Sequence, residues 1–129
     1  HRPRPESIES LLTAIHANSC IAMADCSNLA EGLAAHRLGF DCVGSTLSGY
    51  TQETRCADDA LPDEALVRDL SAAGVWTIAE GRYQTPELAA QALQWGAKAV
   101  TVGSALTRLE WMVQRYRQQM LVRPEAGVQ

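Results

Sequence analysis

The chain repeats one pattern of hydrophobic and polar positions four times along its length. Each repeat begins with a short apolar run, passes through a polar loop and enters a helical stretch. The four apolar runs are residues 20–24, 42–46, 75–79 and 99–102. Each run is almost continuously apolar rather than alternating, which is typical of parallel strands covered on both faces. The pattern therefore predicts four buried parallel strands.

Local signals mark the ends of the helices between these strands. Asn28 with Glu31, and Thr107 with Glu110, fit the capping-box pattern, in which the first residue caps a helix and the glutamate follows three positions later. Thr85 precedes a proline, the residue favoured at the first helical position. Three glycines each follow a helical stretch, as glycines that end helices do. They are Gly39, Gly74 and Gly96.

Two further helices flank the repeats, over residues 6–18 and 109–121. Their apolar positions recur at helical spacing, which predicts one apolar face on each. In the first helix these positions are Ile8, Leu11, Leu12 and Ile15. In the last helix they are Met112, Tyr116 and Met120.

One helix followed by four strand–helix units implies an α/β fold with a parallel sheet. Two closures fit this order: an open doubly wound sheet, or a (β/α)8 barrel of which four strands are half. Periodicity alone does not choose between them. We treat residues 1–129 as one partial domain, with a leader and helix over 1–18, the four units over 19–122 and a tail over 123–129.

Composition excludes several classes of function. A hydrophobic fraction of 47% and a charged fraction of 20% are ordinary for a soluble globular chain. No apolar run approaches the roughly 18 residues of a membrane span, and no signal peptide is evident. The net charge of -4 argues against a nucleic-acid or anionic-membrane partner. The glycine-rich motifs of dinucleotide and nucleotide binding are missing.

The cysteines and histidines do not form a recognisable metal site. Cys20, Cys26, Cys42 and Cys56 lack metal-binding spacing, so we expect free thiols in a reducing cytoplasm. Cys20 and Cys42 open apolar runs and are expected to be buried. The histidines lie in the leader or in helices, where surface positions are expected. They are His1, His16 and His36.

The candidate chemistry follows the strands, because both closures bind ligands beyond the carboxyl ends of their strands. Asp25 and Glu80 leave two strands at equivalent positions and are candidates for acid–base work, or else cap helices and form ion pairs. At the exit of the second strand stand Thr46, Ser48 and Tyr50, which are further candidates for binding a substrate. The loop over residues 51–61 is either a lid or an ordinary surface loop.

Two glycine turns suggest a phosphate site. Gly81 stands beside Arg82, and Gly103 stands beside Ser104 with Arg108 close behind. Glycine lets backbone N–H groups approach an anion, and arginine adds charge-assisted hydrogen bonds. Barrels often bind phosphate in the loops after their last two strands, which these turns would be.

Six stretches of the chain carry a resemblance to a known family. They are residues 2–5, 22–27, 46–51, 78–83, 85–87 and 102–108. In their order and spacing the chain resembles the N-acetylmannosamine-6-phosphate 2-epimerase family. The resemblance implies the last four βα units of a phosphate-binding (β/α)8 TIM barrel. It also implies interconversion of N-acetylmannosamine 6-phosphate and N-acetylglucosamine 6-phosphate in sialic-acid catabolism, by proton removal and return at C2, without metal or organic cofactor.

The resemblance also implies roles for single residues. Glu80 matches the family's catalytic-site glutamate and Asp25 its sugar-contacting aspartate. The phosphate positions would be Gly81, Gly103, Ser104 and Arg108, with the phosphorylated amino sugar as partner. The family's acid–base lysine follows its third strand, whereas the single lysine here, Lys98, enters a strand at the opposite end.

We therefore expect an N-terminally truncated epimerase that is inactive alone. Its protein partner would be a second copy or the missing N-terminal half. The alternatives are another phosphate-binding barrel enzyme, of aldolase or synthase type, and a non-catalytic half-barrel that binds phosphosugar.

Overall fold

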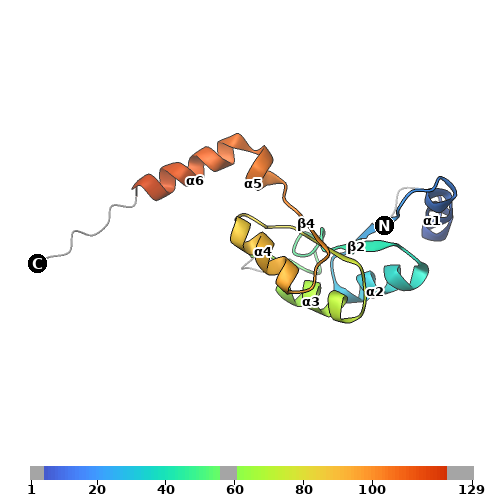
Figure 1. Cartoon of the computed structure of the whole chain (residues 1–129). Helices are drawn as coiled ribbons and strands as arrows, with labels where there is room; N and C mark the ends of the chain where they lie inside the picture. The colour runs from blue at the N-terminus through green and yellow to red at the C-terminus, as the bar shows by residue number, and fades with distance from the viewer. Residues whose placement is uncertain (1–4, 56–60, 122–129) are drawn as a thin grey trace, which may run out of the picture.

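A four-stranded parallel sheet forms the centre of the computed structural model, which describes residues 5–55 and 61–121 (Figure 1). Its strands are β1 (Met23–Asp25), β2 (Cys42–Gly44), β3 (Thr77–Glu80) and β4 (Ala99–Thr101). All pairings are parallel and the strands are neighbours in chain order. A doubly wound sheet reverses its order at a switch point, whereas a barrel adds strands in sequence. The order therefore fits the barrel closure.

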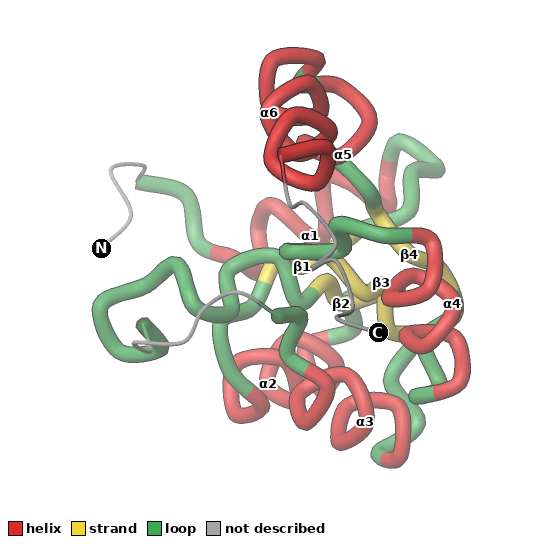
Figure 2. The backbone as a smooth tube through the Cα atoms, turned by 90° about the vertical axis from the view of Figure 1, so that its left-hand side faces the viewer, coloured by secondary structure: helices red, strands yellow, loops and turns green. Residues whose placement is uncertain are grey.

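The helices pack mainly on one face of this sheet. They are α1 (Ile8–Ala17), α2 (Leu29–Leu38), α3 (Glu64–Ala72), α4 (Pro86–Gln94), α5 (Ser104–Thr107) and α6 (Leu109–Leu121). Helices α2, α3 and α4 cover one face, while α5 and α6 extend away from the sheet (Figures 1 and 2). This arrangement leaves the carboxyl ends of the strands accessible.

Two of the three predicted helix caps are confirmed. Asn28 accepts a hydrogen bond from the Glu31 N–H at 3.0 Å, and Thr85 accepts one from the N–H of Leu88 at 3.3 Å. The Glu31 carboxylate departs from the capping box, since it bonds the preceding serine rather than Asn28. The third predicted cap, at Thr107, is wrong. Thr107 is the last residue of α5, and its hydroxyl donates to the Gly103 carbonyl oxygen within that helix.

The three predicted terminating glycines are confirmed, because each has a positive φ just after a helix. The values are 99° at Gly39, 80° at Gly74 and 104° at Gly96. Residues with a side chain rarely adopt this conformation, so glycine is the natural choice there.

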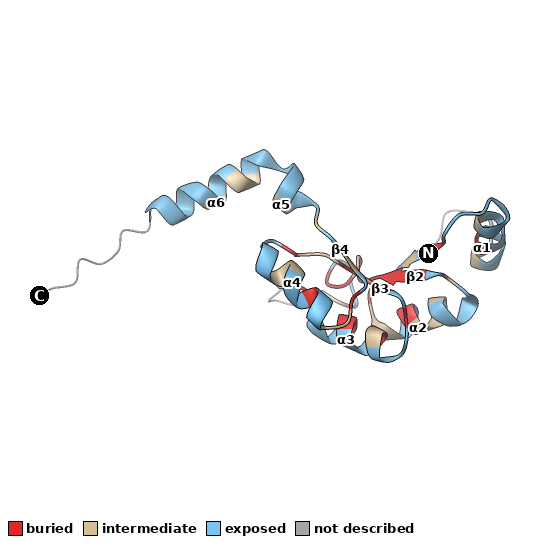
Figure 3. Cartoon of the chain, viewed as in Figure 1, coloured by how far each residue is buried: buried red, intermediate tan, exposed pale blue. Residues whose placement is uncertain are grey.

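The core lies between the sheet and helices α2 to α4 (Figure 3). Two adjoining clusters of buried side chains form it. The first contains Cys26, Val43, Leu66, Leu70 and Val75. The second contains Val67, Ala79, Tyr83, Ala92 and Ala97. These clusters fix β2 and β3, the strands that carry most of the candidate chemistry.

The prediction that all four strands are covered on both faces is wrong for the outer pair. Strand β2 is fully buried, but β1 and β4 expose residues, because they are the edges of an open sheet. Ile21, just before β1, is 78% exposed. The apolar stripe predicted on α6 is likewise unpacked, since Tyr116 and Met120 are exposed. Apolar surface at both edges therefore lacks a covering layer within the described residues.

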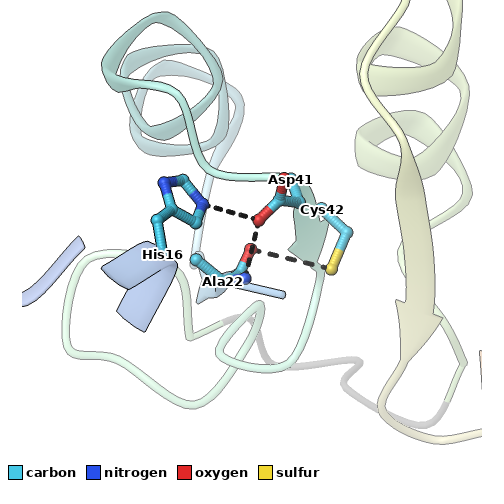
Figure 4. Close-up of polar contacts among 4 residues, drawn as sticks. All are labelled: His16, Ala22, Asp41 and Cys42. Carbon is cyan, nitrogen blue, oxygen red and sulfur yellow. Dashed lines mark hydrogen bonds and ion pairs between the residues drawn. The ribbon is translucent and has the colours of Figure 1, made fainter. Parts of the chain in front are cut away.

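At the amino end of the strands, a polar contact joins α1 to the sheet (Figure 4). His16 Nε2 lies 2.9 Å from Asp41 Oδ2, and the Ala22 N–H donates to the same oxygen at 2.7 Å. His16 is thus a helix residue, as expected. Cys42 is buried as predicted, whereas Cys20 is exposed because it lies in the turn before β1.

Candidate functional site

A cavity of about 390 Å³ opens at the carboxyl ends of β2, β3 and β4. Eight of the ten candidate site residues line it: Thr46, Tyr50, Glu80, Gly81, Arg82, Gly103, Ser104 and Arg108. Asp25 and Ser48 are not among the lining residues. Concave sites with a few convergent polar groups are the usual places for small ligands. The loop predicted as a lid or surface segment falls partly on residues 56–60, outside the described residues.

Asp25 is connected to the cavity through one hydroxyl group. Thr46 Oγ1 lies 2.9 Å from Asp25 Oδ1 and 3.1 Å from Glu80 Oε2. Thr46 follows β2, whereas Asp25 and Glu80 end β1 and β3. The carboxylates that end β1 and β3, the two strands that flank β2, thus both lie within hydrogen-bond distance of one side chain.

Ser45, which the sequence reasoning missed, fixes the main chain of Glu80. Its hydroxyl donates to the Glu80 carbonyl oxygen at 2.9 Å and accepts from the Glu80 N–H at 3.0 Å. Ser45 is only 3% exposed, so water competes little for these bonds. A small polar residue at the end of an otherwise apolar run was the available signal.

Both glycine turns line the cavity. Gly81 has a φ of 101°, and an added Cβ would contact the Tyr50 ring at 3.7 Å. Within the described residues, the N–H groups of Gly81, Gly103 and Ser104 donate to no protein acceptor. Free N–H groups at a glycine turn suit an anionic ligand.

Arg82 lines the cavity but its guanidinium is also bound by the neighbouring loop. Nε donates to the Leu61 carbonyl oxygen at 2.6 Å, and Nη1 donates to that of Ser48 at 2.8 Å. The guanidinium lies 5.5 Å from the centre of the Tyr50 ring. The main-chain φ of Arg82 is 64°, which is unusual for a residue with a side chain. Arg82 thus holds the two ends of the loop over residues 48–61 against β3.

Ser48 is buried and does not line the cavity. It is 4% exposed, and its hydroxyl donates to Asp63 Oδ2 at 2.6 Å. The other oxygen of Asp63 accepts from the Leu66 N–H and caps α3. The contacts of Ser48 in this structure are therefore structural.

Arg108 also lines the cavity, and its Nε donates to Glu110 Oε1 at 2.9 Å. Both side chains are exposed, and pairs of this kind contribute little to stability. The hydrogen bond from Arg108 holds the pKa of Glu110 below its usual value. Arg108 can exchange this weak pairing for a ligand at small cost.

Two buried groups beside the site are held neutral. Burial, with the Asp63 charge adding to it and Arg82 opposing it, raises the pKa of Tyr83 to about 12. Among the described residues its hydroxyl has no hydrogen-bond partner. Burial, followed by the charges of Glu31, Asp25 and Asp63, raises the pKa of Cys26 to about 11. A neutral thiol is a poor nucleophile, so Cys26 is a core residue.

Residues 5–55 and 61–121 offer no evident metal site or membrane span. No group of three His, Cys, Asp or Glu side chains in this part of the chain is placed to hold a metal ion. None of the helices found there is long and apolar enough to cross a bilayer. The arrangement offers carboxylates for proton transfer and backbone donors for an anion.

Proteins of similar sequence share most of this chain. The model of a family described as "Putative N-acetylmannosamine-6-phosphate epimerase" matches residues 1–121. A Haemophilus influenzae protein named "Putative N-acetylmannosamine-6-phosphate 2-epimerase" is 60% identical over 112 residues, or 87% of this chain and 48% of that protein. A protein of the same name from Edwardsiella ictaluri is 58% identical over 118 residues, or 91% and 48%.

Two solved structures share the fold. The N-acetylmannosamine-6-phosphate 2-epimerase from Clostridium perfringens superposes with a TM-score of 0.82 at 41% identity, over 92% of this chain and 51% of its own. A structure titled "Native KDPGal structure" superposes at 0.57 and 19% identity, over 89% and 52%, which shows the fold alone. Both are TIM barrels, so the fold prediction is confirmed: this chain is the C-terminal half of a (β/α)8 barrel.

The chain spans about half the length of the curated relatives it matches. The family model nevertheless covers nearly all of the chain, and the motifs that suggested the family lie within the matched residues. The chain therefore belongs to the N-acetylmannosamine-6-phosphate epimerase family.

Proposed function

We propose that this chain forms the C-terminal half of an enzyme that interconverts N-acetylmannosamine 6-phosphate and N-acetylglucosamine 6-phosphate. One observation carries the proposal. Glu80, Gly81, Gly103 and Ser104 line the same cavity, and within the described residues the N–H groups of the last three donate to no protein acceptor. A phosphosugar bound there would place its phosphate at the glycine turns and its reacting carbon toward the carboxylates.

The proposed reaction removes the C2 proton and returns it to the opposite face. When the C–H bond breaks, its electron pair moves toward the neighbouring carbonyl oxygen, and reprotonation at C2 restores the sugar with inverted configuration. Glu80 would act at the reacting end and Asp25 would contact the sugar. Tyr50 and Thr46 complete that wall, while Arg108 assists the phosphate.

The acid–base lysine that the family resemblance implies has no counterpart at a strand exit in these residues. Lys98 precedes β4 at the amino end of the sheet, where its N–H donates to the Thr77 carbonyl oxygen at 2.8 Å. Residues at that end of a barrel usually serve stability. We therefore propose that residues 1–129 alone are inactive, because the lysine that transfers protons together with Glu80 comes from the N-terminal half of the barrel.

The proposed setting is the degradation of sialic acid in the cytoplasm. A phosphorylated amino sugar is a charged metabolite, and the cysteines Cys20, Cys26 and Cys42 are free thiols, as a reducing compartment favours.

A second candidate is a non-catalytic half-barrel that binds phosphosugar. The absence of a lysine at any strand exit favours it for this polypeptide taken alone. It predicts binding of the sugar phosphate without exchange at C2 under any condition. An aldolase or synthase would instead break or form a carbon–carbon bond, so analysis of the products separates the three.

The test combines purified residues 1–129 with the N-terminal half of the Haemophilus influenzae relative. N-acetylmannosamine 6-phosphate is supplied in D₂O, and deuterium entry at C2 is followed by NMR. We expect no exchange by residues 1–129 alone and exchange by the mixture. The two halves of the relative, mixed in the same way, are the control. Exchange by the control but not by the mixture would overturn the proposed activity, and exchange by residues 1–129 alone would overturn the assignment of the base.

A further inference from the structure

Gly44, the last residue of β2, and the next two residues, Ser45 and Thr46, hold the two candidate acids in place. The Thr46 hydroxyl lies within hydrogen-bond distance of both the Asp25 and the Glu80 carboxylates. The Ser45 hydroxyl bonds both main-chain groups of Glu80. Gly44 pairs with Asp25 in the register of β1 and β2. One tripeptide thus contacts acids on both neighbouring strands.

Gly44 provides the space for this contact. A Cβ at Gly44 would lie 2.8 Å from Thr46 Oγ1, 3.4 Å from Asp25 Oδ1 and 2.4 Å from the terminal carbon of Met23. The φ of Gly44 is not among the positive values, so its backbone does not require glycine. The lack of a side chain at Gly44 instead leaves room for the Met23 side chain and the Thr46 hydroxyl, which approach most closely.

The hydroxyl cannot satisfy both ionised acids at once. A threonine hydroxyl has one proton to donate, and an ionised carboxylate only accepts. Thr46 therefore donates either to Asp25 or to Glu80. The contact of Thr46 with the acid to which it does not donate becomes a hydrogen bond when that acid is protonated and donates its proton to Thr46 Oγ1. The direction of the two bonds then depends on which acid is protonated.

We propose that Thr46 is a positioning residue that couples Asp25 and Glu80 through this reversible hydroxyl. When Glu80 takes up a proton, the hydroxyl turns to donate to Asp25 and accepts from Glu80. When Glu80 releases the proton, the hydroxyl turns back. Gly44 makes room for this unit and Ser45 keeps Glu80 in register. The importance of the coupling for C2 proton transfer rests on the proposed function, whereas the coupling itself does not.

Other titratable and charged groups surround the pair. The cavity wall that contains Glu80 also contains Tyr50, Arg82, Tyr83 and Arg108. Glu31 lines a groove together with Asp25, and Cys26 follows Asp25 in the chain. The Thr46 hydroxyl joins the two acids directly, so a variant of Thr46 changes that link and leaves these side chains in the sequence.

The first test follows the side-chain carboxyl carbons of Asp25 and Glu80 by NMR from acidic to neutral pH in residues 1–129. In the wild type, the chemical shift of the Glu80 carboxyl carbon plotted against pH should show two steps. One of these steps should fall at the same pH as the step of the Asp25 carboxyl carbon. Thr46→Val, which keeps the shape but removes the hydroxyl, should lose most of the second step. Thr46→Ser should keep it, and Thr13→Val, in α1, is the matched control. Gly44→Ala should reduce the step by displacing the hydroxyl.

A second step unchanged in both Thr46→Val and Gly44→Ala would overturn the proposal. A kinetic arm uses the mixture with the N-terminal half. There Thr46→Val should lower kcat about 10-fold, the size of one hydrogen bond to a charged group, while KM changes little and Thr46→Ser restores kcat. An inactive wild-type mixture would count against the proposed function but leave the NMR result decisive for the coupling.

Discussion

Both ends of the sheet carry carboxylates that join separate segments of the chain, but the carboxylates are bonded differently. At the amino end, Asp41 receives fixed donors on one oxygen, the Ala22 N–H and His16 (Figure 4). At the carboxyl end, Asp25 and Glu80 share one hydroxyl and the second of them faces a cavity. An acid paired with fixed donors holds elements together, whereas acids that share a movable donor retain the capacity to exchange protons and bind a ligand.

The largest effect should follow removal of the acid at the carboxyl end. In the mixture with the N-terminal half, Glu80→Gln should slow C2 exchange about 10²–10⁴-fold, the usual contribution of a general acid or base. Glu64→Gln is the matched control, because Glu64 pairs with Arg68 on the outer face of α3. Exchange at the wild-type rate in Glu80→Gln would remove Glu80 from the chemistry.

Loss of the cation at the cavity wall should have the next largest effect. Arg108→Ala should weaken binding of the phosphorylated sugar by about 1.5–3 kcal/mol, the range for hydrogen bonds to charged groups. Calorimetry with N-acetylmannosamine 6-phosphate measures this in the mixture. Arg68→Ala, on α3, should leave the affinity unchanged. If Arg108→Ala binds the phosphorylated sugar as tightly as the wild type, Arg108 is not a phosphate ligand.

At the amino end, glycine substitutions should affect stability without affecting the ligand. Gly74→Ala places a side chain at a positive φ with open space around it, which should cost about 1–2 kcal/mol. Gly96→Ala has a similar φ, but its Cβ would also lie 2.8 Å from Ser71 Cβ, so it should cost more. Urea unfolding measures both. Equal losses in the two variants would contradict the close packing of Gly96 against Ser71.

The Asp41 pairing predicts a dependence of stability on pH. The hydrogen bond from the Ala22 N–H, with a smaller effect of His16, holds the pKa of Asp41 below its usual value. A depressed carboxyl pKa adds stability above the unfolded value of about 3.9, and this stability is lost as the pH falls through the folded value. In Asp41→Asn, the urea concentration at the unfolding midpoint should therefore fall less steeply as the pH is lowered into the acid range. Asp69→Asn, at an exposed position of α3, is the control and should keep the wild-type dependence on pH. If Asp41→Asn shows a dependence as steep as that of the wild type, the contacts of Asp41 with His16 and Ala22 do not stabilise the fold.

Local patterns in the sequence were sufficient to predict the strands, most helices and most of the candidate residues that line the cavity. Continuous apolar runs identified all four strands, and the residues directly after them identified Glu80 and Gly103. The Thr107 cap failed although its local pattern matched, because that residue is used within the short α5.

Features that depend on distant contacts were not predictable in this way. Arg82 bonds carbonyl oxygens of Ser48 and Leu61, and no local pattern reports such contacts. The Thr46 bridge depends on the register that places Asp25 beside Gly44. The exposure of β1 follows from the lack of a neighbouring strand within these residues, which an apolar run cannot reveal.

The contrast between the two ends is tested most directly by mapping where the ligand binds. N-acetylmannosamine 6-phosphate is titrated into isotopically labelled residues 1–129, and the backbone amide signals are followed by NMR. The account predicts shifts at the carboxyl end, at Gly81, Gly103 and Ser104, and none at Ala22, Asp41 and Lys98 at the amino end. Shifts centred on the amino-end residues, or none at the glycine turns at saturating ligand, would contradict it.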